Sequence, residues 1–218
     1  MKSDLQLQRD VQDELRWEPS VNAAAIGVSV TDGIVTLTGS VATFAEKKGA
    51  VRSTQRVAGV RGIANNLEVR LPHLQERTDA DIARAAIHIL EWNVFVPRER
   101  VTVTVHNGWI TLEGAVEWQY QRAAAEHTVQ SLMGVRGVTN AIAVKPAVTT
   151  PDVKAQIEAT LRRRAAAGGQ DITVDIRGPK VVLSGSVRSW AAWDEADAAA
   201  WAAPGVYDVE NRLIVVSE

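Results

Sequence analysis

Hydrophobic and polar residues follow one another along the chain in an order that occurs three times. Each unit begins with apolar residues spaced four apart, as in Leu7, Val11 and Leu15, which is the spacing of one face of an amphipathic helix. Two runs of alternating polarity follow, the first at residues 26–30, and predict two half-buried strands. An alanine-rich helical segment and one more alternating strand complete the unit. The pattern therefore predicts the element order α-β-β-α-β in three tandem units.

The repetition extends to individual residues. One fixed offset between units one and two, and another between units two and three, align the copies without gaps. Two glycines and one asparagine recur at identical positions, namely Gly39, Gly114 and Gly185; Gly59, Gly134 and Gly205; and Asn65, Asn140 and Asn211. Proline-bearing connectors separate the copies. We therefore expect three domains, at 1–72, 77–146 and 149–218, because each copy of such a repeat is one structural unit.

The connections between the first two strands of each unit predict tight hairpins. Asp32-Gly33 and Asn107-Gly108 are dipeptides that favour a type I′ turn. Gly178-Pro179 in the third unit fits a type II′ turn, whose second central residue has negative φ and accepts proline. We expect the first recurring glycine to end the second strand, and the second to stop the following helix in a left-handed conformation.

These elements together predict an α+β protein of three tandem small αββαβ domains. The tight hairpin makes the first two strands antiparallel, whereas the second helix returns the chain to a parallel third strand. Each domain is then a three-stranded mixed sheet with two helices packed on one face.

The ordered motifs resemble the BON domain family. The resemblance rests on V-x-L-x-G after the hairpin and on G-V-x-x-V-x-N after the second helix. The first unit has VTLTGSV and GVRGIANNL, the second ITLEGAV and GVRGVTNAI, and the third VVLSGSV and GVYDVENRL. The resemblance implies an αββαβ fold, association with phospholipid or the bacterial cell envelope, a place among osmotic-stress proteins of the OsmY type, and no catalytic activity.

The residues themselves give little support to catalysis. The chain has no cysteine, which excludes thiol chemistry and cysteine-ligated metals. Its four histidines occupy non-equivalent positions, and none forms the helical metal pair with another. We therefore expect a non-enzymatic protein without cofactor or metal. The net charge of −2 argues against a nucleic-acid partner, for which a basic excess is typical.

The asparagine shared by all three units is open to two interpretations. It could contact a ligand, or it could lie just before the third strand and hydrogen-bond neighbouring backbone, as asparagine does in turns. We favour the backbone role, and by the same logic we assign the recurring glycines to backbone geometry.

Seven tryptophans are the unusual feature of the composition. Trp17 and Trp92 occupy the same position near the end of the first helix, where the third unit has Arg163. Arg162, Arg163 and Arg164 either complement the helix dipole or contact an anionic headgroup. Tryptophan is amphipathic and favours membrane interfaces and binding hot spots, but it also widens a thin core. These five residues are candidates for a binding surface.

The sheet faces that the helices leave open provide the remaining candidates. Alternation places polar residues on this face in the first unit, Trp109 among threonines in the second, and Val182, Ile214 and Val216 in the third. A solvent-facing sheet rarely carries such an apolar cluster without a function. We expect a contact here between repeats or between two chains.

No stretch is apolar enough to span a membrane, and the N-terminal segment is amphipathic rather than a signal peptide. The sequence thus predicts a cytoplasmic protein, whereas the family resemblance implies the periplasm. Reversible binding to anionic phospholipid or envelope proteins is the first hypothesis for its function. The alternatives are a cytoplasmic protein-interaction or self-assembly scaffold, and a small-ligand or ion sensor at the repeat interfaces.

Overall fold

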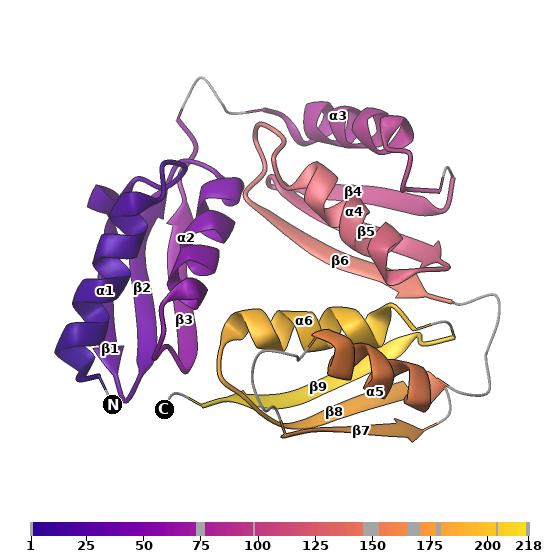
Figure 1. Cartoon of the computed structure of the whole chain (residues 1–218). Helices are drawn as coiled ribbons and strands as arrows, with labels where there is room; N and C mark the ends of the chain where they lie inside the picture. Colours follow the sequence, from indigo (N-terminus) through magenta and orange to yellow (C-terminus); the bar gives the residue numbers. More distant parts are fainter. Residues whose placement is uncertain are drawn as a thin grey trace.

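The three units fold as three α+β repeats with the same architecture (Figure 1). The structure, a computed structural model, describes residues 2–72, 77–97, 99–145, 153–164, 171–177, 180–203 and 205–216. The first repeat contains α1 (Asp4–Trp17), a short 3-10 helix η1 (Ala23–Ala25), β1 (Ile26–Thr31), β2 (Ile34–Val41), α2 (Phe44–Arg56) and β3 (Gly62–Val69). The second contains α3 (Asp79–Trp92), β4 (Val101–His106), β5 (Trp109–Val116), α4 (Gln119–Val129) and β6 (Gly137–Val144). The third contains α5 (Val153–Arg164), β7 (Asp171–Arg177), β8 (Lys180–Val187), α6 (Trp190–Trp201) and β9 (Asp208–Val215).

Each repeat has its own three-stranded mixed sheet. The second strand lies in the centre, antiparallel to the first strand and parallel to the third. In the first repeat α1 packs over β1, α2 packs over β3, and the two helices touch. Leu7, Val11 and Leu15 of α1 are buried against the inner face of the sheet, where Val35 and Leu37 are fully buried. The expected fold class is confirmed.

Helix starts and hairpin tips are tied together by one carboxylate in each of the first two repeats. The Oγ of Ser3 caps α1, so that Asp4 is the first helical residue. The side chain of Asp4 then accepts hydrogen bonds from the backbone N–H groups of Asp32 (2.9 Å) and Gly33 (3.1 Å). These two turn residues have positive φ, as a type I′ turn requires. The predicted hairpin is therefore also held from the helix side.

The second repeat repeats this arrangement. Asp79 accepts from the backbone N–H of Asn107 and of Gly108, both at 2.8 Å. The bond from Gly108, followed by that from Asn107, holds the pKa of the Asp79 carboxyl below its ordinary value. The turn residues 178 and 179 of the third repeat lie outside the described residues.

The recurring glycines all occupy the left-handed half of backbone space. Gly39, Gly114 and Gly185 have φ of 115°, 132° and 117°. A Cβ at Gly114 would lie 2.0 Å from the backbone oxygen of Arg100, so a side chain cannot fit. The expectation that this glycine ends the second strand is wrong, because the strand continues for two further residues in every repeat. The glycine instead lets the first and second strands approach inside the sheet.

The repeats join through their second helices, α2, α4 and α6, which face the middle of the molecule (Figure 1). Phe44 of α2 is 7% exposed and belongs to the core cluster of the second repeat. Trp201 of α6 packs against that same cluster as well as against its own. The indole Nε1 of Trp190 donates to the backbone oxygen of Val60, 3.1 Å away in the first repeat. We call these contacts the central junction.

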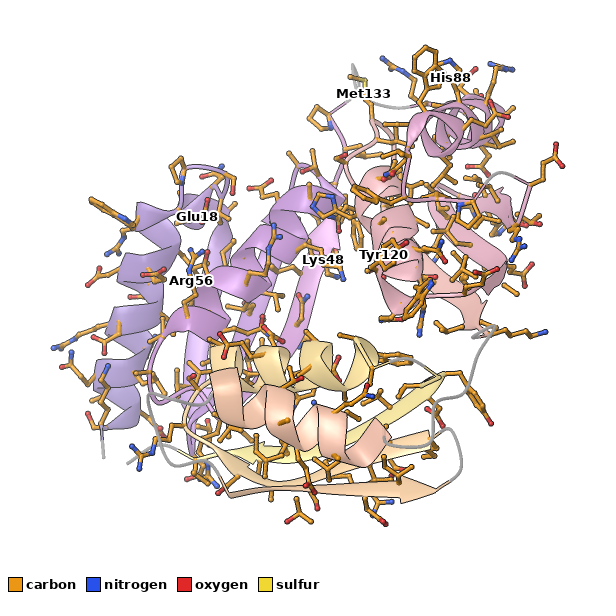
Figure 2. All side chains as sticks on the ribbon, turned by 45° about the vertical axis from the view of Figure 1, so that its right-hand side comes forward. Glu18, Lys48, Arg56, His88, Tyr120 and Met133 are labelled. Carbon is orange, nitrogen blue, oxygen red and sulfur yellow. The ribbon has the colours of Figure 1, made fainter. Side chains whose placement is uncertain are left out.

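An ion pair adds to the central junction. Lys48 of α2, labelled in Figure 2, lies 3.2 Å from the carboxylate of Glu126 on α4. Both side chains remain partly exposed, so the pair contributes well under about 1 kcal/mol. Apolar burial around Phe44 and Trp201 is therefore the main force that joins the repeats.

Candidate functional site

The asparagine common to the three repeats is bonded internally. It lies in the middle of the third strand and not before it, so its expected position is wrong. In each copy Oδ1 accepts from the backbone N–H two residues further on, at 3.2 Å from Leu67, 3.3 Å from Ile142 and 3.1 Å from Leu213. Asn140 also donates to Glu126 (3.3 Å), and Asn211 to Asp197 (3.2 Å). These bonds tie the strand to the second helix and support the backbone interpretation.

A cluster of strongly exposed apolar side chains, among the described residues, lies in the second repeat at the end of α3. Residues 92–96, which we call the aromatic loop, hold the side chains of Trp92, Val94 and Phe95 outward. Their exposed fractions are 78%, 89% and 58%. Such exposure of three neighbouring apolar side chains is typical of a surface that another molecule covers.

The aromatic loop is anchored by its two less exposed residues, Asn93 and Val96. Val96 is 6% exposed and belongs to the core of the second repeat. Asn93 donates to Thr128 Oγ1 on α4 (2.6 Å) and accepts from the backbone N–H of Phe95 (2.9 Å). The loop is therefore held at Asn93 and Val96 while Trp92, Val94 and Phe95 project outward.

Tyr120 extends this surface from the start of α4. Its ring meets that of Phe95 edge to face, with centroids 6.2 Å apart, and it is 55% exposed (Figure 2). On the other side, the ring of His88 lies 5.8 Å from that of Trp92. A hollow beside the loop is lined by Glu91, Trp92, Asn93, Val94, Val96 and Glu99. Two of these six residues are carboxylates, which disfavour an anionic group in the hollow.

Trp17 projects from the equivalent position of the first repeat and is 83% exposed. The loop that follows it is polar rather than apolar. Glu18 pairs with Arg56 at 2.9 Å, and Arg56 also reaches Glu14 at 3.0 Å (Figure 2). Hydrogen bonds from Arg56, and then from Ser20, lower the pKa of Glu18 to about 2. The Arg56 cation at this helix end is thus paired with two carboxylates.

The three arginines of the third repeat lie at the end of α5. Arg163 occupies the position of Trp17 and Trp92, as the sequence alignment requires. The side chains of Arg162, Arg163 and Arg164 lie outside the described residues, so their role as headgroup contacts stays a prediction.

The outer sheet faces carry the remaining candidates. Trp109 is 49% exposed on the second sheet. On the third sheet Ile214 and Val216 are 64% and 43% exposed, whereas Val182 is only 7% exposed. Among the described residues, the contacts between repeats lie at the second helices and not at Ile214 or Val216. A contact between two chains at this face stays a prediction.

Three of the other tryptophans belong to the interior. Trp190, Trp193 and Trp201 all pack against the core of the third repeat, and the first two have ring centroids 5.9 Å apart. Asp194 and Asp197 lie between Trp193 and Trp201 on α6, and burial raises the pKa of both.

In the part of the chain that the structure describes, no three histidine, aspartate or glutamate side chains gather into a metal-binding group.

Sequence reasoning found Trp92 but missed Val94, Phe95 and Tyr120. The repeat alignment singled out Trp92 because Trp17 matches it. Val94 and Phe95 lie in a short connection without periodicity, where the sequence does not tell an inward side chain from an outward one.

Comparison with known proteins gives a family but no close relative. The family model of the BON domain matches three times, at residues 3–70, 78–146 and 149–217. No curated protein sequence matches the chain.

Two solved structures align with the whole chain, both of CdsD, a structural protein of the type III secretion system of Chlamydia trachomatis. One is 12% identical with a TM-score of 0.25 and covers 96% of this chain and 92% of that one. The other, its C-terminal domain, is 14% identical with a TM-score of 0.26 and covers 99% and 100%. These scores are too low to relate the folds.

No helix among the described residues is long and apolar enough to cross a membrane.

Proposed function

The chain belongs to the BON domain family and carries three copies of that domain, and from this premise we propose that it is a non-enzymatic binding module. It attaches reversibly to phospholipid surfaces of the bacterial envelope during osmotic or general stress. The aromatic loop is the principal contact in this proposal. The observation that carries it is the outward display of Trp92, Val94 and Phe95 from an anchored backbone.

The chemistry of the aromatic loop fits the interfacial region of a bilayer. Tryptophan and tyrosine prefer this region because one end of each side chain is apolar and the other is polar. Val94 and Phe95 supply apolar area that would be removed from water, at roughly 1.5–3 kcal/mol for a fully buried side chain. The anchors Asn93 and Val96 hold the loop in place, so little entropy is lost when it inserts.

Charge plays the smaller part in this proposal. Glu91 and Glu99 flank the aromatic loop, and Arg100 is paired with Glu117 at 3.2 Å. Attachment therefore depends on apolar insertion more than on the anionic fraction of the membrane. Trp17 offers a second, weaker contact, and several weak contacts in one chain gain avidity when they reach the same surface.

Vesicle co-sedimentation tests the proposal. The full chain is mixed with vesicles of phosphatidylethanolamine and phosphatidylglycerol, and with vesicles of phosphatidylcholine alone. We expect binding to both and its loss in the double variant Trp92→Ser with Phe95→Ser. Both residues are exposed, so the fold should tolerate these changes.

Leu5→Ser is the matched control, because Leu5 is a 70% exposed apolar residue on α1, away from the aromatic loop. It should leave sedimentation unchanged. A chain that sediments with neither vesicle, or a double variant that binds as well as the parent, would refute the proposal.

Self-association through the third sheet is the second candidate function. It is favoured by the exposure of Ile214 and Val216, which are 64% and 43% exposed on the outer face of the third sheet. Replacing both residues with lysine should leave the fold intact, lower the thermal unfolding midpoint and reduce the mass measured by light scattering. A mass that matches one chain before and after the substitution would argue against it.

A further inference from the structure

Trp109 is held in one orientation on the outer face of the second sheet. Its indole Nε1 donates to Thr139 Oγ1, 2.8 Å away on β6. Its six-membered ring lies over Gly137, since a Cβ at that glycine would be 2.4 Å from Cζ3 and 2.5 Å from Cε3. The side chain is nevertheless 49% exposed. The indole therefore lies against the sheet with part of its surface open to solvent.

Covering the glycine does not explain the tryptophan. In the first repeat the equivalent glycine is Gly62, where an added Cβ would lie 3.8 Å from Ile34 Cγ1, an ordinary contact distance. In the third repeat the position is Lys180, which pairs with Asp208 at 3.3 Å and Glu210 at 2.9 Å. A glycine on the third strand therefore does not require an aromatic ring opposite it. What Trp109 adds is a planar aromatic surface whose one hydrogen-bond donor is already used to fix it.

The two sheet rows nearest the indole on its own face are polar and carry no lysine, arginine or carboxylate. Strand pairing places His106, Trp109 and Gly137 in one row across the sheet. The next row consists of Thr104, Thr111 and Thr139. His106 Nε2 accepts from the side-chain amide of Asn107 at 3.0 Å, at the tip of the same hairpin. The exposed indole is therefore bordered by hydroxyl, imidazole and amide groups, without a lysine, arginine or carboxylate in either row.

We propose that this face of the second repeat binds a neutral pyranose glycan, with one sugar ring stacked on the indole of Trp109. The polarised C–H groups on the flat face of a pyranose are attracted to the electron-rich face of an aromatic ring. The sugar hydroxyls take hydrogen bonds from the bordering threonine and histidine side chains. A ligand without charge matches a face whose two rows carry none. Because the hydrogen bond to Thr139 already orders the indole, binding loses little side-chain entropy.

Titration of the full chain with cellohexaose, and separately with hexa-N-acetylchitohexaose, tests this proposal by NMR of the tryptophan indole N–H groups and by calorimetry, which also gives the affinity of variants. The variant Trp109→Ile assigns the signal of Trp109 and is the matched substitution, because Ile34 stands opposite Gly62 at the equivalent position of the first repeat. We expect the Trp109 signal to shift with one or both oligosaccharides in the parent chain. In Trp109→Ile the affinity should fall by about tenfold or more, with an unchanged thermal unfolding midpoint.

Trp92→Ser serves as a second control, since it removes an exposed tryptophan from the aromatic loop and should leave glycan binding intact. Failure of both oligosaccharides to shift the Trp109 signal would overturn the proposal, as would equal affinity in Trp109→Ile. Loss of vesicle sedimentation in Trp109→Ile without any glycan binding would assign this face to lipid instead.

Discussion

The indole of Trp190 in the third repeat donates a hydrogen bond to the backbone carbonyl of Val60 in the first. Eleven residues later on the same helix, Trp201 packs against the core of the second repeat. One helix therefore contacts both of the other repeats, and the three repeats share a junction although each has its own sheet.

Removal of the Trp190 hydrogen bond should weaken the junction. Trp190→Phe keeps an aromatic ring in the core of the third repeat but leaves the carbonyl of Val60, a 2% exposed residue, without this donor. An unsatisfied buried acceptor costs about 1–3 kcal/mol. Urea denaturation should show a loss of this size. Trp193→Phe is the control, because Trp193 packs in the same core, and an equal loss in both variants would show that the bond to Val60 is immaterial.

Phe44→Ala should destabilise two repeats at once. The side chain is carried by α2 of the first repeat but is buried in the cluster of the second. Deletion of a buried phenylalanine side chain costs about 3–5 kcal/mol. Hydrogen exchange should then become faster in the strands of the second repeat as well as in α2. Leu37→Ala, in the core of the first repeat, should accelerate exchange mainly in that repeat, and unaltered protection of β5 in Phe44→Ala would contradict the prediction.

Asp79→Asn should lower stability at neutral pH and have less effect in acid. The pKa of Asp79 is depressed in the folded state by the N–H groups of Gly108 and Asn107. A depressed pKa means that the carboxylate contributes its stabilisation above the unfolded pKa, and that this contribution is lost as the pH falls through the folded value. Denaturation midpoints of parent and variant should therefore differ at pH 7 and converge in acid. A difference that is constant with pH would speak against a charge-dependent tie.

Glu18 should titrate far below an ordinary glutamate. Its pKa is held at about 2, chiefly by Arg56 and then by Ser20. The stabilisation from this pair is complete above the unfolded pKa of glutamate and is lost as the pH falls toward 2. NMR titration of the side-chain carboxyl should report the depressed value, and Arg56→Gln should move it toward the ordinary range. A Glu18 pKa that is the same in both proteins would exclude Arg56 as the cause.

Local patterns were sufficient for the architecture of each repeat. The side chains of Ser3 and Thr78 cap their helices, and the turn residues Asp32 and Asn107 take the positive φ that their dipeptides require. The strand boundaries were less accurate, because Gly114 looked like a strand end but lies within a ladder. A glycine in the sequence indicates a backbone position with positive φ. Whether the strand ends at that glycine is decided by the pairing with neighbouring strands.

The sites depended on contacts that local patterns do not encode. Trp17 and Trp92 were found because they match between repeats, and both are exposed. Phe44 gave no such signal, since the same position holds glutamine and tryptophan in the other repeats. Its burial comes from a repeat distant in sequence.

The sequence by itself determined the three αββαβ units, the hairpins and the buried stripe of each helix, because helix and strand periodicity and turn dihedrals act over a few residues. Tertiary structure alone decided how the units meet and which apolar side chains stay uncovered. Trp190 and Trp201 became junction residues because each packs beside another repeat. Trp92 stayed exposed, with no such contact among the described residues. That difference arises between surfaces far apart in the chain, where burial depends on the neighbour and not on the pattern.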